Sequence, residues 1–260
     1  MGTALAKADV PMNIGLYQSA SALSALERWQ DSVAQNITSS QTTGYRKRTI
    51  NFSAQQAGEL RADPRSRGRS EPSMAMQFPS VNSGINFVTG EMQPTRRDLD
   101  VAIQRDGFFE MQMKDGTKAY SRAGEFRVRP DRTLVTGGDH EVLSEGGAPI
   151  TLIAGGGPVT INRDGTIFQG ETALGKLSIK KFANPAELIP IKDGFFVPAA
   201  GAEPLAVEEP ELMQGYLEGS NVTPLREMVD LVLISRAYEA NQKIISTVDQ
   251  QMQKTLDALG

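Results

Sequence analysis

Hydrophobic residues recur at a seven-residue spacing at both ends of this chain, while the sequence between the ends is typical of short strands and turns. A heptad pattern predicts a helix whose apolar seam packs against a partner. The predicted seam near the C-terminus comprises Leu231, Ile234, Tyr238, Asn241, Ile245, Val248, Met252, Thr255 and Leu259. The more polar N-terminal seam comprises Leu16, Ser19, Leu23, Leu26, Gln30, Val33, Ile37 and Ser40. We therefore expect each predicted helix to pack against an apolar partner, either the other helix or a further chain.

These patterns predict an α+β fold. Long N- and C-terminal helices would form a coiled-coil-like pair, with a central all-β domain of short antiparallel strands. The first helix, within residues 12–44, would begin after Asn13 and end before Gly44, which suits the left-handed position after a helix. The last helix, within residues 213–260, would have Thr223 as its cap and Pro224 in its first turn. Asn241 and Gln30 would set the register of the seams.

Two regions lie between the helices. Residues 45–97 are rich in Gly, Pro, Ser and Arg, which predicts an extended connector. Residues 98–212 alternate apolar and polar positions in short runs, including 99–103, 109–113, 159–161 and 176–179. Asp-Gly pairs at 106–107, 115–116 and 164–165 are turn signals between such runs. We therefore expect a compact all-β domain over residues 98–212.

Composition excludes several kinds of chemistry. The 260-residue chain has a net charge of −4, no cysteine and one histidine. Thiolate sites and two-histidine metal sites are therefore impossible, and no catalytic, cofactor or metal residue is predicted. No apolar run reaches the length of about 20 residues that a membrane span needs. The first eleven residues lack the apolar stretch of a cleaved secretory signal, and we expect none.

Two local patterns resemble sites but have simpler interpretations. His140 follows Gly-Gly-Asp and is expected to be an exposed turn histidine. Residues 170–177 match the glycine and lysine spacing of a phosphate-binding loop. However, Leu177 stands where the magnesium-binding hydroxyl is required, and an alternating, strand-like run follows where a helix must begin. We therefore interpret this segment as a β-turn between strands.

A basic tract interrupts the acidic chain between residues 44 and 70. It contains two acidic residues and seven basic ones, Arg46, Lys47, Arg48, Arg61, Arg65, Arg67 and Arg69. Three interpretations stay open: a solvated linker, a surface for nucleic acid or anionic lipid, or a contact between subunits. The acidic residues Glu203, Glu208, Glu209 and Glu211 offer a protein counterpart for the third interpretation.

Segments beside both helices resemble known signatures. Residues 36–48 read NITSSQTTGYRKR, and residues 215–222 read GYLEGSNV before the helix that contains Arg-Ala-Tyr-Glu. Residues 98–109 and 120–126 fit the same family, so the match covers nearly the whole chain. The matching positions are Asn36, Thr42, Thr43, Gly44, Tyr45, Leu217, Glu218, Ser220, Asn221, Val222, Arg236, Ala237 and Tyr238. The chain thus resembles the bacterial flagellar basal-body rod and hook proteins.

The resemblance implies a structural subunit of the flagellar rod, of the proximal FlgF or distal FlgG type, located in the periplasm-spanning part of the basal body. Its implied partners are copies of itself, other rod and hook proteins, and the flagellar type III export apparatus. Neither nucleic acid nor direct membrane insertion is implied. The family usually begins near Met12, so residues 1–11 are interpreted as an extension or a misassigned start. Residues 39–41 read Ser-Ser-Gln where asparagine is typical.

Length and the LEGSNV run favour the proximal FlgF type narrowly, while the Arg-Ala-Tyr-Glu run favours the distal FlgG type. A hook-type subunit is an alternative within the family. From other classes, the alternatives are a nucleic-acid- or envelope-binding module that uses the basic tract, and a carboxylate-based glycan hydrolase. The hydrolase has only abundant Asp and Glu in its favour, with no acidic pair at a defined separation. The sequence therefore predicts a protein that is not an enzyme.

Overall fold

The structure is a computed structural model that describes residues 14–60 and 74–259. The predictions made for residues 1–11, Asn13, Arg61, Arg65, Arg67 and Arg69 lie outside the described residues. The chain divides into two compact units. Of the described residues, 14–34, 50–60, 74–83 and 228–259 form the helix–hairpin unit, and 35–49 and 84–227 form the β unit. The chain therefore passes from one unit to the other four times.

The two long helices are α1 (Ile14–Thr38) and α2 (Pro224–Leu259), and two 3-10 helices are η1 (Pro185–Glu187) and η2 (Lys192–Gly194). The strands up to residue 142 are β1 (Arg48–Leu60), β2 (Met74–Ile85), β3 (Met92–Pro94), β4 (Val101–Ile103), β5 (Phe108–Gln112), β6 (Lys118–Ser121), β7 (Phe126–Val128), β8 (Leu134–Thr136) and β9 (Glu141–Val142). The later strands are β10 (Val159–Ile161), β11 (Thr166–Gln169), β12 (Thr172–Lys176), β13 (Ile179–Lys181), β14 (Leu188–Pro190), β15 (Phe195–Pro198), β16 (Leu205–Ala206), β17 (Leu212–Gln214) and β18 (Tyr216–Glu218).

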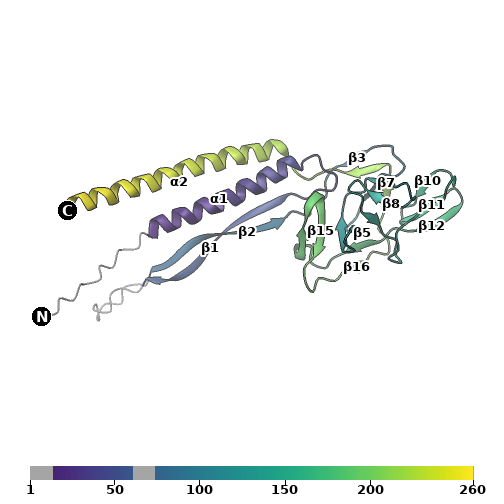
Figure 1. Ribbon diagram of the computed structural model, residues 1–260, viewed down its shortest axis with the longest axis horizontal. Coiled ribbons are helices and arrows are strands. Elements are labelled where there is room, and N and C mark those ends of the chain that lie inside the picture. Colours follow the sequence, from purple (N-terminus) through teal and green to yellow (C-terminus); the bar gives the residue numbers. More distant parts are fainter. Residues whose placement is uncertain (1–13, 61–73, 260) are drawn as a thin grey trace. The chain divides into compact units, whose positions relative to one another are not determined.

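In the helix–hairpin unit, α1 lies between α2 and the two-stranded sheet of β1 and β2 (Figure 1). The ring of Trp29 on α1 meets Phe52 on β1 edge to face, with 5.5 Å between ring centroids. The Ser21 hydroxyl donates a hydrogen bond to the carbonyl of Pro79 in β2. Helix α1 therefore packs against the hairpin through contacts that the heptad pattern does not include.

The predicted coiled-coil-like pair of long terminal helices is wrong. Helix α1 has only 25 residues against 36 in α2. A coiled-coil seam buries its residues along the whole contact. Of the predicted α2 positions with described side chains, only Ile234 is buried; five are half-buried and two, Met252 and Thr255, are exposed. On α1, Gln30 is exposed, while Ala25, Leu26, Ser32 and Val33 are buried. The reason is that α1 serves two neighbours, so its contacts are spread around the helix.

Strands β1 and β2 lie within residues 45–97, the range that the sequence predicts as an extended connector. In the helix–hairpin unit the Ser53 hydroxyl lies 3.5 Å from the Ser80 carbonyl oxygen across this pair. In the β unit the Asn86 amide donates to the Lys47 carbonyl. Pairing over such a sequence distance leaves no local periodicity, which explains why the sequence did not reveal these strands.

The β unit is built from antiparallel strands. Its main sheet has the order β14-β15-β6-β5-β9-β8-β7, and β13 pairs with both β5 and β16. A second sheet has the order β10-β11-β12, and two further pairs are β17 with β4 and β18 with β3. The principal core contains the fully buried side chains of Ile103, Phe109, Met111, Phe126 and Leu134. A smaller aromatic cluster holds Phe108, Tyr120, Phe182 and Phe196.

Several local expectations can be compared with these strands. Residues 176–179 do not form one strand, because β12 ends at Lys176 and β13 begins at Ile179. The segment that resembles a phosphate-binding loop lies in the β11–β12 turn and in β12. His140 is half-buried rather than exposed, and its ring lies 5.0 Å from that of Phe195. Gly165 has a φ of 92°, consistent with its Asp-Gly turn.

Candidate assembly sites

The signature segment at the end of α1 (residues 36–48) contacts the signature segment before α2 (residues 215–222) inside the β unit. The Gly44 amide donates a 2.7 Å hydrogen bond to the Glu218 carbonyl. The Lys47 amide donates to the Asn221 side-chain oxygen at 2.6 Å, and the Asn221 amide donates to the Tyr45 carbonyl at 3.4 Å. The Asn221 side chain also donates to the carbonyls of Asn86 and Val88, both at 2.8 Å. We call this region the signature junction.

Asn36 forms the centre of the signature junction. Its side-chain nitrogen donates to the Arg48 carbonyl and to a Glu227 carboxylate oxygen, both at 2.9 Å. Its oxygen accepts from the Arg48 amide at 2.8 Å and from the Tyr45 hydroxyl at 3.2 Å. Burial raises the pKa of Tyr45 despite the nearby Arg48 charge, which keeps the hydroxyl protonated as a donor. An asparagine side chain can make four such bonds, so Asn36 is fully satisfied.

Two buried carboxylates bind cations from the basic tract. Glu227, in the first turn of α2, is fully buried and pairs with the ammonium of Lys47. Glu218 pairs with Arg46 at 2.5 Å and lies 3.5 Å from Arg122. Removing one member of such a pair is costly, because the remaining charge stays buried without its partner.

Arg122 makes a hydrogen bond and a contact with an aromatic ring in addition to its ion pair with Glu218. Its guanidinium donates to the Ile103 carbonyl at 3.0 Å and lies 5.5 Å from the centre of the Phe108 ring. Burial lowers the pKa of Arg122 to about 10, although the Glu218 charge opposes this shift. The group is therefore still a cation at neutral pH. The signature junction thus contains two arginines against one carboxylate at Glu218.

Gly44 is required by the close packing of this region. Its φ is 67°, and a Cβ built on it would lie 2.4 Å from the Ala123 nitrogen and 2.5 Å from the Arg122 carbonyl carbon. The predicted role of Gly44 as the residue that ends the first helix is wrong, because α1 already ends at Thr38. Its conformation instead allows the backbone to approach the β unit. By contrast, α2 begins at Pro224, where the sequence placed its first turn.

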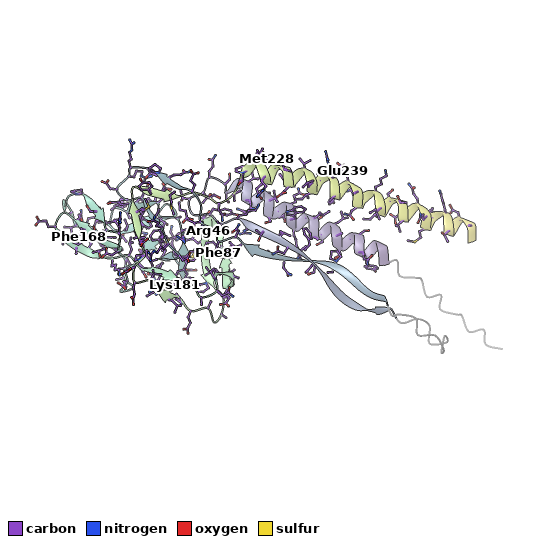
Figure 2. The ribbon with its side chains drawn as sticks, turned by 180° about the vertical axis from the view of Figure 1, so that it is seen from behind. Arg46, Phe87, Phe168, Lys181, Met228 and Glu239 are labelled. Atoms are coloured by element: carbon purple, nitrogen blue, oxygen red, sulfur yellow. The ribbon has the colours of Figure 1, made fainter. Side chains whose placement is uncertain are left out.

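A second candidate site is an apolar face on α2 that is exposed in the described chain. Leu225, Met228, Val229 and Val232 are 74%, 52%, 54% and 53% exposed. Their spacing of three and four residues places them on one face of the helix. The buried Ile234 lies on the opposite side of the helix. We call the four exposed residues the outer face of α2; Figure 2 shows Met228 near the start of this helix.

The sequence identified some of these residues and missed others. Among the predicted signature positions, Asn36, Gly44, Tyr45, Glu218 and Asn221 converge in the signature junction. Thr42, Thr43, Leu217, Ser220 and Val222 lie beside them in the β unit, whereas Arg236, Ala237 and Tyr238 lie further along α2 in the helix–hairpin unit.

Arg122 was not predicted as part of a site, and neither was the outer face of α2, whereas Lys47 was predicted only as a member of the basic tract. The outer-face residues are spaced by three and four positions in the sequence, but they lie outside the predicted heptad seam. Two cations of the basic tract form ion pairs within the chain: Arg46 with Glu218, and Lys47 with Glu227.

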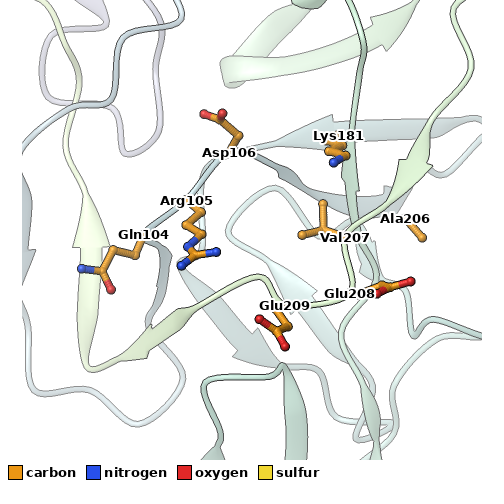
Figure 3. Close-up of a pocket in the computed structure, with 8 residues that line it drawn as sticks. All are labelled: Gln104, Arg105, Asp106, Lys181, Ala206, Val207, Glu208 and Glu209. Carbon is orange, nitrogen blue, oxygen red and sulfur yellow. The ribbon is translucent and has the colours of Figure 1, made fainter.

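No catalytic arrangement accompanies these sites. In the residues that the structure describes, no cluster of three metal-binding side chains occurs. None of the described helices is long and apolar enough to cross a membrane. The β unit has an open groove of about 640 Å³, and five of the eight side chains that line it are charged (Figure 3). The surfaces described here are an exposed apolar face on α2, of the kind that contacts partner proteins, and a polar junction between residues 36–48 and residues 218–227.

Comparison with known proteins identifies the kind of assembly. Residues 213–258 match the family "Flagellar basal body rod FlgEFG protein C-terminal", and residues 102–169 match "Flagellar hook protein FlgE/F/G D1 domain". The chain is 31% identical over 251 residues to the flagellar basal-body rod protein FlgF of Caulobacter vibrioides, covering 96% of this chain and 99% of the relative.

Two further relatives show the same kinship. The FlgF protein of Escherichia coli is 34% identical over 92% of this chain and 95% of its own length. The FlgG protein of Agrobacterium fabrum is 32% identical over 84% of this chain and 88% of its own length. The chain therefore belongs to the flagellar basal-body rod proteins of the FlgF/FlgG type. It is a structural subunit of the bacterial flagellar basal body and is not an enzyme.

Proposed function

We propose that this subunit polymerises helically as part of the hollow rod, and that the outer face of α2 is a main contact between subunits. The observation that carries this proposal is that α2 is apolar on two opposite sides. One side includes the buried Ile234, and the other exposes Leu225, Met228, Val229 and Val232. A helix with one partner needs only one apolar face. The second face is therefore available to another subunit.

Burial of this face would contribute to assembly. Fully burying an exposed valine, leucine or methionine side chain contributes about 1.5 to 3 kcal/mol. The four side chains are between 52% and 74% exposed, so each gains part of that amount, and the remaining association energy comes from other contacts in the polymer. Repetition of one contact between identical subunits produces a helix when the rotation does not close.

A charged substitution on the outer face tests this proposal. Val232→Asp should prevent incorporation of the protein into basal bodies and abolish motility, because it buries an unpaired carboxylate at the contact. Gln242→Asp is the matched control: the same charge at an exposed position of α2 away from the outer face. Both variants should show wild-type far-UV circular dichroism. Normal assembly of Val232→Asp, or equal loss in Gln242→Asp, would refute the role of this face.

Within the rod, we infer that the FlgF-like proximal position is favoured over the FlgG-like distal one. The LEGSNV run and the length counted from Met12 support this assignment, whereas coverage does not separate the two types, because each type includes relatives that match 95% or more of their own length. Complementation tests this assignment. Expression of the chain should restore rod assembly in its host after deletion of the native copy, and should not replace a deleted FlgG protein. If the chain instead restores rod assembly in a strain that lacks FlgG, and does not restore it in the strain that lacks the native copy, the assignment is reversed.

The partners we propose are copies of this chain, other rod and hook proteins, and the flagellar type III export apparatus. Family membership supports all three. A role for the basic tract in nucleic-acid or envelope binding receives less support, because Arg46 and Lys47 form buried or half-buried ion pairs with carboxylates of the same chain. Phosphate binding at these two positions would have to break those pairs.

A further inference from the structure

The charged groove on the β unit has an unfilled strand edge beside it. The groove is lined by residues 104–106, by Lys181 at the end of β13, and by residues 206–209 at and after β16, as Figure 3 shows. Strand β16 pairs with β13, and no other described strand pairs with it. Its Leu205 side chain is 46% exposed. A free edge of this kind can accept a further strand through its main chain.

The walls of this groove carry an excess of negative charge. Arg105 is neutralised by Glu211, at 2.6 Å. Among the described residues, no salt bridge engages Asp106, Glu208 or Glu209, and Lys181 is the remaining cation on the walls. Three carboxylates against one ammonium leave two negative charges. An extended segment with a complementary positive charge therefore fits this groove better than an acidic or neutral one.

The chain itself contains such a segment. Residues 61–73 read RADPRSRGRSEPS, with four arginines against one aspartate and one glutamate. Their net charge of two positives matches the two negatives of the groove. Arg65, Arg67 and Arg69 alternate with small residues, so an extended strand would place all three guanidiniums on one face, about 6.7 Å apart. Pro64 and Pro72 lie on either side of this run and limit such a strand to its arginine-rich part.

We infer that the groove beside β16 binds the arginine-rich segment 61–73 of a second copy of this chain. The segment adds a strand to the edge of β16, and its arginines pair with Asp106, Glu208 and Glu209. This contact goes beyond the proposed assembly through α2, because its groove lies on the β unit. It is also consistent with an arginine-rich tract that persists in an acidic protein.

Peptide binding tests the groove directly. A fluorescently labelled peptide with the sequence of residues 61–73 is titrated with the full chain, and its anisotropy is measured at low and high salt. The double variant E208Q/E209Q should bind about fivefold more weakly, as expected for two exposed ion pairs. The control E91Q/E171Q changes the net charge equally at two exposed positions away from the groove and should change the affinity less than twofold. A peptide carrying R65S, R67S and R69S should not bind.

Three results would overturn the inference: absence of binding by the native peptide, equal weakening in the control variant, or equal binding of the serine peptide. The measurement is repeated in the Val232→Asp background, where the α2 contact is lost. If Val232→Asp still binds the peptide, the groove contact does not depend on the α2 contact. Peptide binding then tests the groove, and basal-body assembly of Val232→Asp tests the α2 proposal, so the two can fail separately.

Engineered cysteines test whether the segment comes from a second copy, because the natural chain has no cysteine. A chain with Arg67→Cys is mixed with a chain carrying Glu208→Cys and oxidised mildly. A covalent heterodimer is expected on a non-reducing gel, while Arg67→Cys mixed with Glu171→Cys should give none. If the double variant Arg67→Cys/Glu208→Cys instead closes only within monomers, the segment binds within its own chain and the inference is wrong.

Discussion

Replacing Asn36 is the most direct test of the signature junction. Asn36→Ala removes four hydrogen bonds: two with the Arg48 backbone, one with Tyr45 and one with Glu227. A neutral hydrogen bond contributes about 0.5 to 1.5 kcal/mol and one to a charged group about 1.5 to 3 kcal/mol. Glu227 is fully buried and would keep only Lys47 as its side-chain partner. We therefore expect a loss of about 3 to 5 kcal/mol in the free energy of unfolding of the β unit.

The measurement is equilibrium unfolding of the full chain in denaturant. Far-UV circular dichroism follows the β unit together with the helices, while the fluorescence of Trp29, the single tryptophan, follows the helix–hairpin unit separately. Gln35→Ala is the matched control, because Gln35 is the exposed neighbour of Asn36 and has one side-chain bond, to Ser39. The control should change stability by about 0.5 kcal/mol or less.

A double-mutant cycle then isolates the contact with the carboxylate. If the bond between Asn36 and Glu227 is real, Asn36→Ala and Glu227→Gln together should cost less than the sum of the two changes, by about 1 to 3 kcal/mol. A loss for Asn36→Ala no larger than that of Gln35→Ala, or strict additivity in the cycle, would refute the reasoning.

Two further predictions concern the β unit. Gly44→Ala should destabilise the β unit by more than 2 kcal/mol in denaturant unfolding, roughly the cost of overpacking, because the new Cβ would meet the backbone of residues 122 and 123. The control Gly116→Ala replaces a glycine that has a φ of 84° but open space around it, so it should cost less. Equal losses in the two variants would contradict the steric argument. Burial raises the pKa of Glu110, but hydrogen bonds from Ser178 and Lys118 outweigh this and lower the pKa overall. Its contribution to stability is therefore present above the unfolded pKa of 4.5 and is lost as the pH falls through the lower folded pKa. The stability difference between wild type and Glu110→Gln should shrink as the pH is lowered below 4.5, and a constant difference in acid unfolding would argue against this assignment.

The sequence by itself determined the family, the start of α2 and the strand-rich character of the middle of the chain. These features are local: Thr223 and Pro224 restrict the backbone where they stand, and Asp-Gly pairs favour turns through their own geometry. The signature residues could also be recognised without a structure, because their order along the chain is itself the signal.

Tertiary structure decided the partners of those residues. Asn36 and Glu227 are separated by 191 positions, and Lys47 and Glu227 by 180, so no periodicity connects them. Arg46 is a surface cation by composition, but the fold buries it against Glu218. Likewise, the heptads correctly indicated that α2 has an apolar side, but not that α1 would also pack against a β-hairpin. Helical spacing describes which residues share a face, whereas the neighbour that covers a face depends on contacts between distant parts of the chain.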